Sequence, residues 1–161
     1  MHRARGGYLL VESLVALSVL TVGFLGIVSL LSRSLSLNRT VSDTHIATYL
    51  AAEGIEVLKN MIDANILQGL PWTNGITSGD HEVVYNSTAL EPYQARLLGF
   101  DPGTNLYIYG GSEPTRFTRR VRITFVGSEE VVVESRVNWT AAGGGSFSAR
   151  LEDHFLKWRQ Q

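Results

Sequence analysis

Residues 8–31 read YLLVESLVALSVLTVGFLGIVSLL, an apolar run of 24 residues in which Glu12 is the only charged side chain. As an α-helix this run would be about 36 Å long, against a hydrocarbon core of about 30 Å in a typical bilayer. Arg3 and Arg5 precede the run, and the next charged residue is Arg33. Positive residues before a first span favour a cytoplasmic N-terminus. The sequence therefore predicts a single membrane span with the rest of the chain outside the cytoplasm.

The apolar run has three possible interpretations, which differ in how they account for its length and for Glu12. A secretory signal peptide has a shorter apolar region, about 7 to 15 residues, followed by a cleavage site of small residues. A plain single-pass anchor accounts for the length but not for an acid in the span, which costs on the order of 2.5 to 3.5 kcal/mol at a helix centre. If the chain is instead cut after Gly7, the new amine of Tyr8 lies one helical turn from Glu12. The amine of a neighbouring copy could then pair with Glu12 in a layer of low dielectric constant.

The segment Gly7-Tyr8-Leu9-Leu10-Val11-Glu12 resembles the cleavage and methylation motif of type IV prepilins, with glycine before the cut, an aromatic first mature residue and glutamate fifth. Residues 14–26, LVALSVLTVGFLG, are similar to PilV-type minor pilins and to the I-type pseudopilins of type II secretion. By this resemblance, a prepilin peptidase cuts between Gly7 and Tyr8 and methylates the Tyr8 amine. Glu12 then pairs with the N-terminus of another subunit, and the helix packs in the core of a filament.

The resemblance implies a structural role, that of a minor pilin that joins or initiates a type IV pilus. A type II secretion pseudopilin is the alternative, and a DNA-uptake (competence) or adhesive tip subunit is an alternative of another class. The expected partners are the prepilin peptidase, other pilin or pseudopilin subunits, the inner-membrane assembly platform and the membrane, with nucleic acid as a less favoured partner. The chain is expected first in the cytoplasmic membrane and then in a cell-surface or periplasmic filament.

Three parts are expected along the chain: a leader at 1–7, a transmembrane and assembly helix at 8–33, and an extracytoplasmic head at 34–161. Residues 8–63 contain no proline, and apolar residues recur at helical spacing from 40 to 67, so one continuous helix should run from the span into the head. Its two glycines, Gly23 and Gly26, either weaken the helix locally or allow another helix to pack closely. The three glycines and one proline of residues 69–81 should end it.

Alternating apolar and polar residues near the C-terminus predict an antiparallel meander. Its three strands are expected at residues 116–126, 130–140 and 147–158. A three-residue loop at 127–129 would place Arg122 opposite Glu134 and Arg120 opposite Arg136. The predicted fold class is therefore α+β, and pilin-like by the resemblance, with a long N-terminal helix packed on a C-terminal antiparallel meander.

Between the predicted helix and the predicted meander, the alternation that indicates strands is weaker. Short strands are expected at residues 82–85 and 105–109, and the rest of residues 86–115, rich in proline and glycine, is expected to be an irregular surface region. The tryptophans are expected to pack in the core rather than to form a carbohydrate or peptide surface.

Five arginines would project from one face of the meander and could hold DNA phosphates: Arg116, Arg120, Arg122, Arg136 and Arg150. Glu134 and Glu152 would share that face and weaken its field. A surface of mutually paired charges is therefore favoured over a site for a polyanion, and the net charge of −1 agrees with this preference.

Other chemistry has little support in the sequence. The chain has no cysteine and contains no nucleophile elbow, phosphate-binding loop or HExxH motif. Four residues in the predicted loops and short strand could serve a hard cation but match no calcium-loop spacing: Asp80, Glu82, Asp101 and Asn105. We therefore expect no enzymatic activity, no cofactor and no metal.

Overall fold

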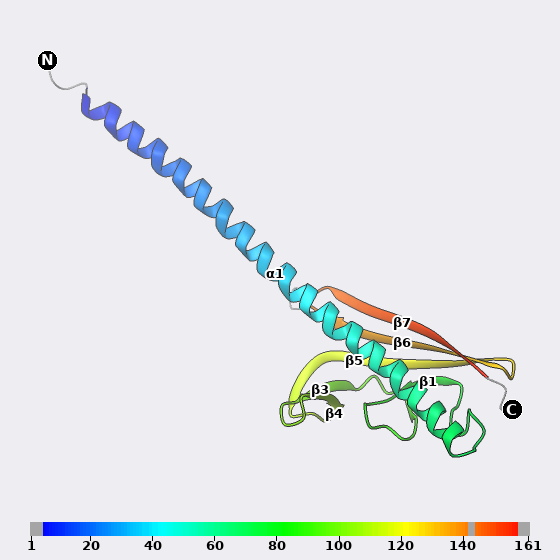
Figure 1. Ribbon diagram of the computed structural model, residues 1–161. Helices are drawn as coiled ribbons and strands as arrows, with labels where there is room; N and C mark the ends of the chain where they lie inside the picture. Colours follow the sequence, from blue (N-terminus) through cyan, green and yellow to red (C-terminus); the bar gives the residue numbers. More distant parts are fainter. Residues whose placement is uncertain (1–4, 142–143, 158–161) are drawn as a thin grey trace. The chain divides into compact units, whose positions relative to one another are not determined.

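The computed structural model describes residues 5–141 and 144–157, with side chains from residue 8 onward. Over these residues it contains one α-helix, α1 (Arg5–Leu67), and a seven-stranded antiparallel sheet, which confirms the α+β class (Figure 1). The chain divides into two compact units between Ser42 and Asp43, and α1 contributes to both. We call residues 8–42 the N-terminal segment and residues 43–157 the head. Residues 1–4 of the predicted leader, and Trp158, lie outside the described residues.

The helix α1 is uninterrupted, as the absence of proline predicts. It ends at Leu67 and is capped by Gly69, which adopts a φ of +70° and whose N–H donates to the carbonyl of Ile66 at 3.0 Å. The N–H of Leu70 donates to the carbonyl of Asn65 at 2.9 Å. This pair of reverse hydrogen bonds is a Schellman motif, in which glycine takes the left-handed conformation without a steric penalty.

The sheet belongs wholly to the head. Its strands among the described residues are β1 (Gly79–Glu82), β2 (Glu91–Pro92), β3 (Leu97–Asp101), β4 (Leu106–Tyr109), β5 (Glu113–Val126), β6 (Glu130–Thr140) and β7 (Ser146–Leu156). The order is β2-β1-β5-β3-β4, with β6 also paired to β5 and β7 paired to β6. The long strand β5 is central, because it pairs with β1 and β3 along one edge and with β6 along the other.

Strands β5, β6 and β7 form the predicted meander. Arg122 lies opposite Glu134 and Arg120 lies opposite Arg136, which confirms the expected register. Gly127 opens the three-residue loop between β5 and β6 with a φ of +66°. The register follows from that short loop together with the requirement that the apolar side chains share one face.

The core of the head lies between the second half of α1 and one face of the sheet (Figure 1). Buried helix residues recur at helical spacing and include Ala47, Leu50, Ala51, Val57, Leu58 and Ile62. They share two clusters with alternate residues of β5 and β6, namely Phe117, Val121, Ile123, Val131, Val133, Val137 and Trp139. Gly54 marks a very close approach, since a Cβ there would lie 2.5 Å from Ser135 Oγ. The predicted core position of Trp139 is confirmed.

The region between helix and meander differs from the expectation. Outside the strand expected at 105–109, residues 86–115 are not wholly irregular, because they contain β2, β3 and the start of β5. Leu98 is fully buried, and a Cβ on Gly99 would lie 2.6 Å from the carbonyl oxygen of Gly111. Glycine is needed there because two backbones approach each other, a property that its sequence neighbours do not reveal.

The position of the first strand also needs correction. The expected strand at residues 82–85 is replaced by β1 three residues earlier, and the expected strand at 105–109 begins at Leu106. β1 is set by its long-range partners, since Gly79 pairs with Ile123 and His81 pairs with Val121. Local alternation contains no information about such a partner, so it misplaced the strand.

Candidate functional site

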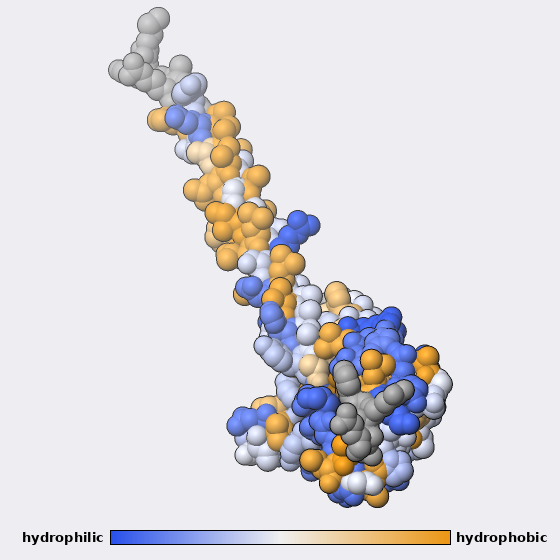
Figure 2. Space-filling model, turned by 45° about the vertical axis from the view of Figure 1, so that its right-hand side comes forward, coloured by the Kyte–Doolittle hydropathy of each residue, from blue (hydrophilic) through white to orange (hydrophobic). Residues whose placement is uncertain are grey.

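The N-terminal segment exposes its apolar side chains. Every described side chain from Tyr8 to Arg39 is exposed, and an 18-residue window of the helix has a mean hydropathy of 2.5 (Figure 2). By length and composition this helix could span a membrane. Three hydroxyl groups in the segment donate to carbonyls one turn earlier at 2.7 Å each: Ser13, Ser18 and Thr21. Those hydroxyl groups are therefore satisfied within the helix, as apolar surroundings require.

Glu12 differs from those hydroxyl groups. Its side chain is exposed, and it forms no hydrogen bond or ion pair with any residue that the structure describes. Tyr8 lies one turn earlier on the same side of the helix and is 77% exposed. The predicted cleavage point between Gly7 and Tyr8 also falls within α1. An unpaired carboxylate on an exposed apolar surface can bind a cationic group of another molecule.

Four of the five predicted arginines meet on the sheet face that the core does not use. Arg120 of β5, Arg136 of β6 and Arg150 of β7 lie side by side in register across three strands. Arg122 lies two residues further along β5. We call these four residues the arginine face.

Acidic residues pair with every member of the arginine face. Glu134 carboxylate oxygens lie 3.6 Å from Arg120, 3.2 Å from Arg136 and 2.9 Å from Arg150. Asp80 accepts hydrogen bonds of 2.7 and 2.9 Å from Arg122, which hold the pKa of that carboxyl below its usual value. Glu152 pairs with Arg150 at 2.6 Å, and this hydrogen bond likewise lowers the pKa of Glu152. The interpretation as a paired surface therefore has more structural support than a polyanion site.

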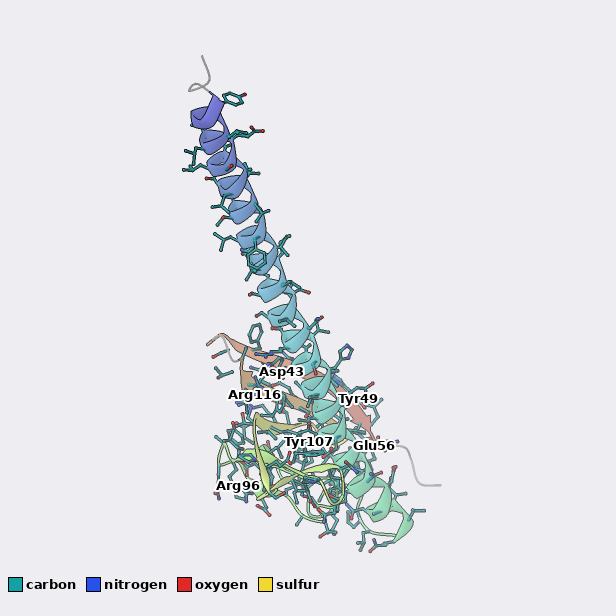
Figure 3. All side chains as sticks on the ribbon, turned by 90° about the vertical axis from the view of Figure 1, so that its left-hand side faces the viewer. Asp43, Tyr49, Glu56, Arg96, Tyr107 and Arg116 are labelled. Atoms are coloured by element: carbon teal, nitrogen blue, oxygen red, sulfur yellow. The ribbon has the colours of Figure 1, made fainter. Side chains whose placement is uncertain are left out.

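The fifth arginine makes a different contact. Arg116, near the start of β5, forms an ion pair with Asp43 of α1 at 3.3 Å (Figure 3). The Asp43 side chain is only 11% exposed, whereas that of Arg116 is 45% exposed. This pair joins the sheet to the first turn of the head's portion of α1 and separates Arg116 from the other four.

One buried charge was not found by the sequence analysis. Arg119 is fully buried on the core face of β5, where it donates hydrogen bonds to the carbonyl of Leu50 at 2.8 Å and to Glu53 Oε1 at 2.9 Å. It also donates to the carbonyl of Val83. The sequence did contain a signal, because Arg119 interrupts the apolar alternation of β5. A charge at such a position requires a partner, and Arg119 joins helix to sheet.

A second buried charge organises the segment after β1. The Glu82 side chain is fully buried and accepts hydrogen bonds from the backbone N–H groups of Gln94 (3.0 Å) and Arg96 (2.9 Å) and from the Arg96 guanidinium. The guanidinium also lies 4.3 Å from the ring centroid of Tyr109. Burial raises the pKa of Tyr109 to about 12. These contacts hold the chain in shape and leave Glu82 unavailable to a cation.

Of the other two candidates for a cation, Asp101 has hydrogen-bond partners within the chain, and Asn105 donates its backbone N–H to the Asp101 carbonyl at 2.8 Å. Asp101 accepts hydrogen bonds from the N–H of Gly103 at 3.0 Å and from the Thr104 hydroxyl at 2.9 Å. The part of the chain that the structure describes contains no group of three or more histidine and acidic side chains able to hold a metal ion.

Comparison with protein-family models, with curated proteins and with solved structures gave no match. The site and its chemistry therefore rest on the residues themselves.

Proposed function

We propose that the chain is a structural subunit of a type IV pilin-like filament, a minor pilin that is cut after Gly7, methylated at Tyr8 and held in the filament through Glu12. One observation carries the proposal. The N-terminal segment is an exposed apolar helix whose acid, Glu12, has no partner among the described residues. A type II secretion pseudopilin would use the same residues in the same way.

The carboxylate of Glu12 lies within the apolar run. An isolated carboxylate in lipid is costly, and a cation from a neighbouring copy removes much of that cost. The amine freed at Tyr8 is such a cation, and it is produced only by the proposed cleavage. Because the attraction is strong where the dielectric constant is low, it would set the register between packed helices. The subunit itself performs no chemistry, and its partners are the peptidase, the assembly platform and other subunits.

Cleavage is tested by intact mass and N-terminal sequencing of the full chain expressed with and without a prepilin peptidase. We expect a mature start at methylated Tyr8 only when the peptidase is present. An uncut chain, under conditions in which a control prepilin is cut, would contradict the proposal and favour a plain membrane anchor.

Assembly is tested separately with Glu12→Ala. The matched control is Glu56→Ala, which removes an exposed acid from the same helix but outside the apolar run; the ion pair that Glu56 forms among the described residues is with Lys59, at 3.7 Å. Both variants should insert and be cut normally, and only Glu12→Ala should fail to enter filaments. Normal incorporation of Glu12→Ala would exclude the pairing role of this acid.

A further inference from the structure

A groove of about 560 Å³ lies beside the C-terminal end of α1. Its lining residues come from the last turns of the helix, the loop that follows the helix, and the turn after β1. Five side-chain amides line it, and we call it the amide groove: Asn60, Asn65, Gln68, Asn74 and Asn86. No part of the N-terminal segment contributes to it.

The lining of the amide groove carries no formal charge. None of its 15 described residues is Asp, Glu, Lys or Arg, although these types make up 18% of the chain. Without a cation the groove has nothing to neutralise a phosphate or sulfate, and without a carboxylate it has no preferred ligand for a hard metal ion. A charged ligand would therefore find no counter-charge in this lining, so the lining favours an uncharged one.

Most of the amides are free to bind. The side chains of Asn60, Gln68, Asn74 and Asn86 form no hydrogen bond with any described residue. Each amide offers two donors and one acceptor that can be used together. Such groups match a ligand that presents many hydroxyl groups, each of which both donates and accepts.

The groove also has apolar surface below this polar rim. Val57 and Ile76 are buried and form part of its floor, and the ring of Tyr85, 44% exposed, contributes to its wall. A sugar ring has an apolar face of C–H groups and an edge of hydroxyl groups, and it fits a site with an apolar floor, an aromatic wall and amides around it. We infer that the amide groove binds a neutral carbohydrate.

The walls of the groove are held in place without a ligand. Asn65 Nδ2 donates to the carbonyls of Trp72 at 3.2 Å and Asn74 at 2.8 Å, which fixes the loop after α1. The N–H of Val84 donates to Ser87 Oγ at 2.8 Å, and the N–H of Ser87 donates to the Val84 carbonyl at 2.9 Å, which fixes the turn after β1. A preformed site loses little ordering entropy on binding.

An extended peptide is a weaker fit. Peptides that bind along a sheet need a free strand edge, and β1, the strand beside this turn, is paired on both edges, with β2 and with β5. The helix end and the two turns present side chains rather than a row of backbone groups.

The test uses the full chain, labelled with ¹⁵N, in micelles of a detergent without a sugar headgroup. The neutral probes are linear hexamers of α-1,4-glucose, β-1,4-glucose and N-acetylglucosamine; dextran sulfate and an uncharged Gly-Ser peptide are the comparison probes. We expect a neutral hexamer to shift the side-chain amide signals of Asn60 and Gln68, with an affinity that does not depend on salt. Asn60→Ala and Gln68→Ala should each weaken binding by roughly tenfold, because each removes hydrogen bonds to the ligand.

The matched control is Gln94→Ala, which removes an exposed amide outside the groove. It should leave the affinity unchanged. The inference is overturned if no neutral hexamer shifts these signals, if the groove variants bind as well as the parent chain, or if the peptide or the polyanion binds the groove instead. The inference does not depend on the proposed function, since an uncut chain would carry the same groove.

Discussion

The two halves of α1 are one continuous helix in opposite surroundings. In the N-terminal segment leucine and valine side chains are exposed on all sides of the helix; Leu20, for example, is 69% exposed. In the head the same helix carries a stripe of buried residues, and Leu58 is fully buried against the sheet. The helix itself needs only local hydrogen bonds and side chains that tolerate it. Burial needs a partner, and only the second half has one within the chain.

The charged side chains of the two regions differ in the same way. Arg119 in the head has its partners within the fold, whereas Glu12 in the N-terminal segment has none among the described residues. A charge that lacks an internal partner on an apolar surface indicates an external one. The second half of α1 thus packs against its own sheet, whereas the first half leaves its apolar side chains and Glu12 exposed, and we propose that another molecule covers them.

The largest expected effect is on stability, when a leucine in each half of α1 is replaced by alanine. Leu58→Ala should lower the free energy of unfolding of the head by about 2 to 5 kcal/mol, because it leaves a cavity in the core. Leu20→Ala should leave that value unchanged, because the side chain is exposed. Chemical denaturation of the full chain in micelles, followed by tryptophan fluorescence, measures both. Equal effects of the two substitutions would contradict the distinction.

A smaller effect is expected from adding a methyl group to each half. Gly54→Ala should destabilise the head by about 1 to 3 kcal/mol, since the new Cβ would lie 2.5 Å from Ser135 Oγ and 3.1 Å from Val121 Cγ2. A Cβ at Gly23 would meet no atom within 4 Å beyond its chain neighbours and the backbone of its own helix, so Gly23→Ala should raise the stability of the N-terminal helix by about 1 kcal/mol. Thermal unfolding followed by circular dichroism tests both.

The double variant Gly54→Ala/Ser135→Ala serves as the control for this contact. It should recover part of the loss, because it removes the hydroxyl that the new methyl group meets. If Gly54→Ala alone is neutral, the helix and the sheet are not in such close contact.

The smallest effect concerns pH, and it is expected in the head, where the side chain of His154 titrates near neutrality, whereas residues 8–42 contain no histidine. The hydrogen bond between His154 Nδ1 and Glu130 Oε1, 2.5 Å long, raises the pKa of His154 above its usual value of 6.5. The folded state thus favours the protonated ring. The resulting stabilisation is complete below pH 6.5 and is lost as pH rises through the raised pKa.

An NMR titration of the His154 ring measures this pKa directly. Glu130→Gln should bring it back toward the usual value, with a change in stability too small to resolve at such an exposed site. A pKa that does not move in Glu130→Gln would show that Glu130 is not the cause.

Sequence reasoning succeeded where the signal is local or periodic. The continuous helix follows from the absence of proline and from apolar spacing, and the β5–β6 register follows from a three-residue loop between alternating strands. The arginine face follows from the same alternation. The alternation failed at β1, whose position is set by its pairing with the distant strand β5, and at β2 and β3, which it did not predict.

The sequence by itself determined the long helix, the exposed apolar run with Glu12, the meander and its register, because each depends on neighbours within a few residues or on a fixed period. Only the tertiary structure decided the pairing of Arg119 with Glu53 and Leu50, the burial of Glu82 under Arg96, and the close approach at Gly54. These contacts join residues distant along the chain. Their energies depend on burial and distance, which no local pattern encodes.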